Sequence, residues 1–204
     1  MHKLSFAQSV GPRQLTVALL LAAAALPAAA QGGAQNGAAG AILPREAAVE
    51  VRIRFLNDLD SLQSKVMALA NAIPAEKYAW RPAEGVRSIG EAFNHVASEY
   101  YVFTPMAYGA KPSPIIQRSR EGMAAFEKGS TKDEVVKNLR EGYAYLKEQL
   151  GALDPAAITG TQKLFGGDRT IIETSFAMSG DLHEHLGQLI AYARLNGVKP
   201  PWSR

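Results

Sequence analysis

Three Ser/Thr-x-x-Glu sequences, each placed at the start of an apolar stripe, constrain the fold of this chain most strongly. They begin at Ser88, Thr131 and Thr170, and each ends in a glutamate three residues later. In such a capping box, each of the two side chains accepts a hydrogen bond from the other residue's backbone amide. These amides lack partners at the start of a helix. The sequence therefore predicts helices that start at these three points.

Apolar residues recur at steps of three and four after each box and also before Pro74, which is the period of an amphipathic helix. A long crossover over residues 109–130, with room for one short helix, separates the second and third predicted helices. In the loop 151–169, Phe165-Gly166-Gly167-Asp168 is a turn signal for a small hairpin. We expect an all-α fold, a four-helix bundle with one long crossover. The predicted helices cover residues 45–72, 88–109, 131–150 and 170–196.

The first thirty residues have the three-part pattern of a secretory signal peptide. Lys3 and Arg13 precede an apolar run over 15–26, and small residues lead up to Ala30. The alternative is a membrane anchor, but the run is shorter than the roughly 20 residues that span a bilayer. We therefore expect cleavage near Ala30, export to the periplasm or the medium, and no stable membrane anchor. Residues 31–44 are predicted to be a Gly/Ala-rich tether, and residues 45–204 the folded domain.

Charge and cysteine content exclude several classes of function. The chain has 22 basic and 19 acidic residues, and loss of Lys3 and Arg13 with the signal peptide leaves 20 against 19. Such a balance gives no electrostatic basis for binding nucleic acid. The chain has no cysteine, so a metal would have to be bound by nitrogen and oxygen ligands.

Three histidines lie beyond the predicted cleavage site, at positions 95, 183 and 185. A helix turns about 100° per residue, so Asp181 and His185, four residues apart, share a face, whereas His183 points to the opposite side. If the second and last helices are neighbours, His95 completes a set of two imidazoles and one carboxylate. Such a set leaves coordination positions open and suits zinc, nickel, iron or manganese. We predict a divalent metal bound by His95, Asp181 and His185.

Other interpretations of these residues stay open. Glu99, four residues after His95, is the rival carboxylate ligand, whereas Glu91 is engaged in its capping box. A histidine in a bundle is often a hydrogen-bonded core residue, and a carboxylate and a histidine four apart can be an exposed helix pair. Gln188 and Tyr192 lie close to the face of His185 and could line the same pocket.

The segment HLGQLIAYARLNGVKPP, residues 185–201, resembles the closing signature of the DinB/YfiT-like superfamily. Upstream, residues 80–91 (WRPAEGVRSIGE) and 94–96 (NHV) resemble the loop and second-helix start of that family. The resemblance implies a four-helix bundle whose metal is bound by one histidine of the second helix and two of the last. His95 and His185 match this pattern, and Asp181 stands where the pattern has a histidine.

Relatives in this superfamily include thiol-dependent transferases and isomerases and metal-dependent hydrolases, so the resemblance implies an enzyme acting on a small-molecule substrate. No separate general base is identifiable in the sequence, and whether the chain is an enzyme stays open. Two alternatives remain. One is a non-catalytic metal- or ligand-binding protein of the stress response or the cell envelope. The other is a metal-free dimeric interaction domain, since relatives often form homodimers.

Overall fold

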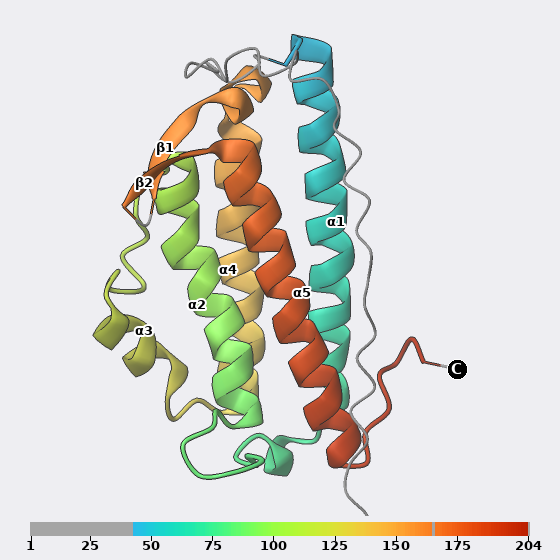
Figure 1. Ribbon diagram of the computed structural model, residues 1–204. Coiled ribbons are helices and arrows are strands. Elements are labelled where there is room, and N and C mark those ends of the chain that lie inside the picture. Colours follow the sequence, from blue (N-terminus) through green and yellow to red (C-terminus); the bar gives the residue numbers. More distant parts are fainter. Residues whose placement is uncertain (1–42, 165, 204) are drawn as a thin grey trace, which may run out of the picture. The chain divides into compact units, whose positions relative to one another are not determined.

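The computed structural model describes residues 43–164 and 166–203, which form a bundle of long helices with a small hairpin (Figure 1). The predicted signal peptide, and the tether up to residue 42, lie outside the described residues. Within the described ranges, none of the helices combines the length and apolarity needed to cross a bilayer. The helices are α1 (Arg45–Ala72), α2 (Ile89–Tyr108), α3 (Arg120–Glu127), α4 (Lys132–Ala152) and α5 (Ile171–Leu195).

The four long helices α1, α2, α4 and α5 pack against one another, which confirms the predicted four-helix bundle. Helix α2 contacts both α4 and α5, and α1 lies against α4 and α5 (Figure 1). The segment between α2 and α4 is the predicted crossover, and it carries the short helix α3, which packs on α2. Two single 3-10 turns, Ala75–Lys77 and Pro155–Thr159, complete the helical structure of the described chain.

The three capping boxes are all present. The hydroxyls of Ser88, Thr131 and Thr170 accept hydrogen bonds from the amides of the glutamates three residues on, and those glutamates accept from the cap amides in return. Helix α2 ends at Tyr108, and the residue that follows, Gly109, has a φ of 64°, a left-handed conformation that glycine adopts without strain. Local sequence therefore determines where three of the long helices begin.

The predicted turn after Leu164 closes a two-stranded antiparallel hairpin. Strand β1 (Thr161–Leu164) pairs with β2 (Gly167–Thr170), with Thr161 opposite Thr170. Strand β1 lies against α2, and β2 leads directly into α5. The hairpin thus covers the end of the groove between α2 and α5.

Helices α2 and α4 lie close together at Gly142. A Cβ atom at this position would lie 3.2 Å from the carbonyl oxygen of Ala97 and 3.2 Å from the rings of Tyr100 and Tyr101. Both tyrosine rings are almost fully buried. Glycine therefore permits the spacing between these two helices.

Candidate metal centre

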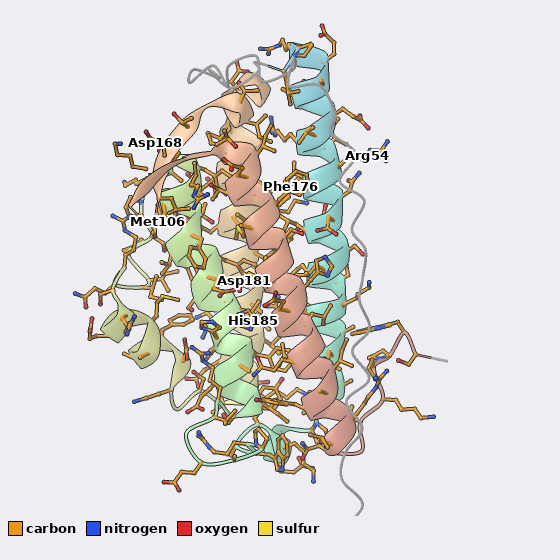
Figure 2. All side chains as sticks on the ribbon, in the orientation of Figure 1. Arg54, Met106, Asp168, Phe176, Asp181 and His185 are labelled. Atoms are coloured by element: carbon orange, nitrogen blue, oxygen red, sulfur yellow. The ribbon has the colours of Figure 1, made fainter. Side chains whose placement is uncertain are left out.

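His95 of α2 and His185 of α5 lie together in the groove between their helices. Their ring centroids are 4.7 Å apart and the ring planes are nearly perpendicular. Both side chains are sheltered, with exposed fractions of 13% and 18%. Figure 2 labels His185 and Asp181, one turn apart on α5. The structure thus brings together the two histidines that the sequence pairs.

Glu99, one turn after His95 on α2, lies between the two imidazoles. Its Oε1 atom is 3.2 Å from Nε2 of His95 and 3.3 Å from Nε2 of His185. The Glu99 side chain is only 4% exposed. One ligand atom from each of these three residues lies within 4.8 Å of the other two, which is a group that could bind a metal ion.

The other ring nitrogen of each histidine has its own partner. Nδ1 of His95 is 2.7 Å from Oε1 of Glu127, at the end of α3, and Glu127 also pairs with Arg87 at 2.6 Å. Nδ1 of His185 is 3.5 Å from the amide oxygen of Gln188, whose Nε2 donates to the hydroxyl of Tyr192. A histidine that donates through Nδ1 presents Nε2 as an acceptor. These partners therefore direct both Nε2 lone pairs towards Glu99.

This arrangement brings three acceptors to one point. Two imidazole lone pairs and a carboxylate oxygen repel one another unless a proton or a cation lies between them. In addition, Oε2 of Glu99 is buried and has no hydrogen-bond partner among the described residues. A buried, unpaired carboxylate oxygen is costly and calls for a partner. The donor set and its unsatisfied oxygen both fit a bound cation.

In the metal-free protein, protons take this position. Burial raises the pKa of Glu99, but hydrogen bonds from His185 and His95 outweigh it and bring the pKa to about 2. Burial likewise lowers the pKa of His95, yet hydrogen bonds to Glu127 and Glu99 raise it to about 9. The hydrogen bond to Glu99 also raises the pKa of His185. The site therefore has a high affinity for positive charge.

Asp181, the third ligand predicted from the sequence, lies at the open side of this cluster. Its Oδ1 is 3.7 Å from Nε2 of His185, and its side chain is 44% exposed. Burial and the neighbouring Glu99 carboxylate raise the pKa of Asp181 to about 6. Asp181 also lines an apolar cavity of about 330 Å³ together with Phe103, Leu164 and Met178. Glu99, the rival ligand in the sequence, is thus the carboxylate that lies between the histidines, and Asp181 lies beyond it.

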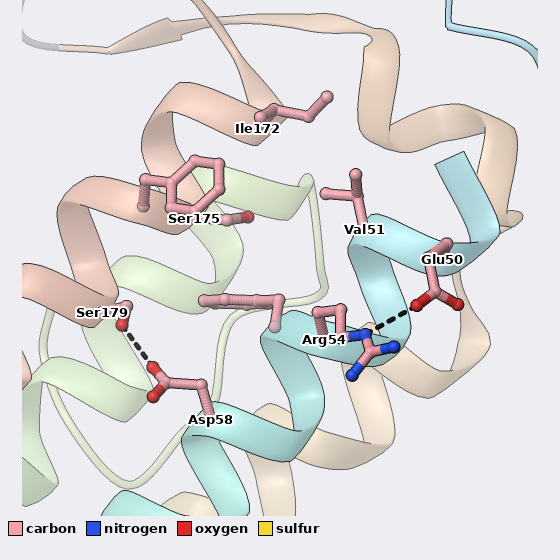
Figure 3. A pocket seen from close by; sticks show the side chains of 9 residues that line it. Glu50, Val51, Arg54, Asp58, Ile172, Ser175 and Ser179 are labelled. Carbon is pink, nitrogen blue, oxygen red and sulfur yellow. Dashed lines mark hydrogen bonds and ion pairs between the residues drawn. The ribbon is translucent and has the colours of Figure 1, made fainter. Parts of the chain in front are cut away.

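His183 faces the other side of α5, as helical geometry requires. Its Nε2 is 3.1 Å from Oδ1 of Asp58 on α1, and Ser179 contacts the other oxygen of that carboxylate at 2.5 Å. Asp58 and Ser179 are at the edge of an apolar cavity of about 320 Å³ between α1 and α5 (Figure 3). His183 is therefore a partner of Asp58, away from the His95–Glu99–His185 cluster.

Glu127 is the site residue that sequence reasoning missed. It is 8% exposed and contacts His95 from α3, 32 residues further along the chain. No local pattern marks it, because it lies in a crossover whose position depends on long-range contacts. Asn94, for example, donates to Phe126 O, Glu127 O and Ser130 Oγ.

Comparison with known proteins agrees with this fold. The model of the DinB superfamily matches residues 58–189. Among solved structures, the bundle is similar to that of a DinB-like protein from Bacillus cereus ATCC 10987, with a TM-score of 0.62 and 14% identity over 74% of this chain and 95% of that one. No curated protein matches the sequence. The family match extends over more than half of the chain and includes α2, α4 and most of α5, and the chain therefore belongs to the DinB superfamily.

Proposed function

We propose that this protein binds one divalent metal ion through Nε2 of His95, Nε2 of His185 and the carboxylate of Glu99. The observation that carries this proposal is the convergence of three sheltered acceptor atoms within 4.8 Å, with a buried Glu99 oxygen that lacks a partner. Asp181 would be the fourth protein group, on the open side of the ion. In this proposal the ligands predicted from the sequence are kept and Glu99 is added to them.

The donor set narrows the choice of metal. Two imidazole nitrogens and carboxylate oxygens suit zinc, iron, manganese and nickel, and the chain offers no thiolate. Nδ1 of His95 is hydrogen-bonded to the carboxylate of Glu127. Histidines that bind a metal through one ring nitrogen commonly donate the other to such a carboxylate. Two carboxylates beside two histidines place more negative charge on the site than a three-histidine set. This charge favours ions that accept oxygen ligands.

The open side of the site supports a role in chemistry on a small molecule. Asp181 is partly exposed and lines a cavity with Phe103, Leu164 and Met178. A metal bound here would supply Lewis acidity to a water or a substrate group. The protein would provide the apolar walls and the Asp181 carboxylate beside it. We propose a metal-dependent hydrolase or a thiol-dependent transferase, the reaction classes that the family resemblance implies.

Elemental analysis of the purified protein, followed by competitive metal titration of variants, tests the site. His95→Ala, His185→Ala and Glu99→Gln should each weaken binding by more than the roughly 10- to 100-fold typical of outer-partner changes. Asp181→Asn should have a smaller effect, because this residue lies on the exposed side. His183→Ala is the matched control and should bind like the wild type.

The same titration also tests whether the cluster binds metal at all. If none of the variants changes the metal affinity, the cluster does not bind metal and the proposal fails. A cobalt(II)-substituted protein tests for an open position. Its visible spectrum should shift on addition of azide if an exogenous ligand can bind, and an unchanged spectrum would favour a closed, non-catalytic metal site.

A further inference from the structure

A third cavity lies between α2 and the crossover helix α3. Its volume is about 420 Å³, within the range of small-molecule pockets. His95 and Glu127 lie in its wall, Asp181 does not, and Phe103 lines both this cavity and the one beside Asp181. Three arginines also line it, at positions 87, 118 and 120.

The arginines differ in their partners. Arg87 is neutralised by Glu127, to which it donates at 2.6 Å. Arg118 and Arg120 have no carboxylate within 4.0 Å in the described part of the chain, although they lie at the same rim. Two guanidinium groups without a counter-charge at the mouth of one cavity attract a carboxylate or phosphate group.

Most of the remaining wall is apolar, apart from His95, Ser119 and Glu127. Val102 is buried, and Phe103, Met106 and Met123 are half-buried beside it. Figure 2 labels Met106 on α2. Methionine side chains adapt to apolar ligands of different shape. An inorganic anion would make no contact with this apolar wall, and an extended polyanion would find only two arginines without a carboxylate partner among the described residues here.

We propose that this cavity binds a small amphipathic organic acid, with its anionic group between Arg118 and Arg120 and its apolar body against Phe103, Met106 and Met123. The proposal goes beyond the metal site and does not require a bound metal. Because His95 is in the wall, such a ligand would lie next to the candidate metal centre.

The test uses metal-free protein labelled with [methyl-¹³C]methionine and two probes of one skeleton, 4-phenylbutanoate and 4-phenylbutan-1-ol. The ring current of a bound phenyl group should shift the methyl signals of Met106 and Met123. Met67, on α1 and outside this cavity, is the internal reference. The acid should bind at least ~10-fold more tightly than the alcohol, because only the acid forms an ion pair with arginine, in which donor and acceptor are both charged.

The double variant Arg118→Gln/Arg120→Gln should remove the preference for the acid and leave the affinity for the alcohol unchanged. The matched control Arg140→Gln/Arg194→Gln removes the same charge from exposed positions elsewhere and should keep the preference. Met106→Ser should weaken binding of both probes. Equal affinity for acid and alcohol in the wild type, or no shift of Met106 and Met123 with the acid, would overturn the proposal. Loss of the preference in the control variant, or competition by inorganic phosphate as effective as by the acid, would overturn it as well.

Discussion

Glu127 fixes the orientation of His95 without being a candidate ligand itself. Its carboxylate accepts from Nδ1 of His95 and from Arg87, which leaves Nε2 of the imidazole directed at Glu99. A carboxylate in this position selects the tautomer that can bind a metal and makes the imidazole a stronger donor. Metal affinity at this site should therefore depend on a residue that never contacts the ion.

Glu127→Gln tests this role. The amide oxygen can still accept a hydrogen bond, but the negative charge is lost, so metal affinity should fall by roughly 10- to 100-fold. The pKa of His95 in the metal-free protein, followed by NMR, should fall as well, because its hydrogen bond to Glu127 is a main cause of the raised value. Glu121→Gln, on the exposed face of the same helix, is the control. Equal effects of the two substitutions would show that the charge acts only at long range.

Metal binding should strengthen as the pH rises. Because hydrogen bonds to Glu127 and Glu99 raise the pKa of His95 to about 9, the imidazole is protonated at neutral pH when no metal is bound. A metal ion must displace this proton, and also that of His185 at lower pH, so the apparent affinity should rise at least about tenfold per pH unit until the pH reaches about 9. Competitive titration at several pH values, with proton release measured by calorimetry in two buffers, checks this. A flat profile between pH 6 and pH 9 would contradict it.

At the scale of the helices, the sequence predicts those helix boundaries that are determined by residues nearby in the chain. The boundaries of α1 and the starts of α2, α4 and α5 follow from Pro74, the apolar period and the capping boxes, and the structure confirms them. The range of α3 was not predictable in this way, because long-range bonds such as that from Asn94 to Ser130 determine its position. The hairpin followed from its turn residues.

The residues of the candidate site also differ in how far the sequence could predict them. Helical spacing placed Asp181 on the face of His185 and set His183 aside, and the family resemblance paired His95 with His185. The prediction took Asp181 as the carboxylate ligand and Glu99 as its rival, but helical spacing alone does not decide between them, since each is one turn from a histidine. The choice depends on how α2 and α5 face each other, and this places Glu99 at 3.2 Å and 3.3 Å from the two Nε2 atoms. Nothing local linked Glu127 to His95.

The cap of α5 should matter for stability, because this helix carries both His185 and Asp181. Thr170→Ala removes the hydroxyl that accepts from the amide of Glu173 and should lower the free energy of unfolding by about 1 kcal/mol. Thr170→Ser keeps the hydroxyl and should retain most of the stability. Urea denaturation followed by circular dichroism measures both. If the two variants lose the same free energy, the cap hydrogen bond is not the cause.

In the bundle as a whole, α2 is a central helix. It contacts α3, α4, α5 and strand β1. It contributes His95 and Glu99 to the candidate metal site, and both cavities beside that site include Phe103. The position of α2 relative to α4 and α5 therefore determines the geometry of the site.

Gly142→Ala tests how tightly that position is fixed. Alanine is the better helix former by roughly 0.5–1 kcal/mol, but its Cβ would lie 3.2 Å from Ala97 O and from two buried tyrosine rings. Overpacking of this kind costs about 1–3 kcal/mol, so a net loss of stability is expected. Gly187→Ala in α5, where a Cβ meets nothing within 4 Å, is the control and should be stabilising. Thermal denaturation measures the stability of both variants. A Gly142→Ala protein that is more stable than the wild type would contradict the expected overpacking.

The close packing of α2 and α4 at Gly142 also affects the positions of the metal ligands. Ala97, whose carbonyl a new methyl group would meet, lies on α2 midway between His95 and Glu99. Any displacement of α2 there carries two of the three donor atoms with it, while His185 stays on α5. The bond lengths around a metal would thus be set in part by a residue that has no side chain and does not line the site. A larger residue at position 142 would therefore change the coordination geometry of a bound ion as well as the packing of the two helices.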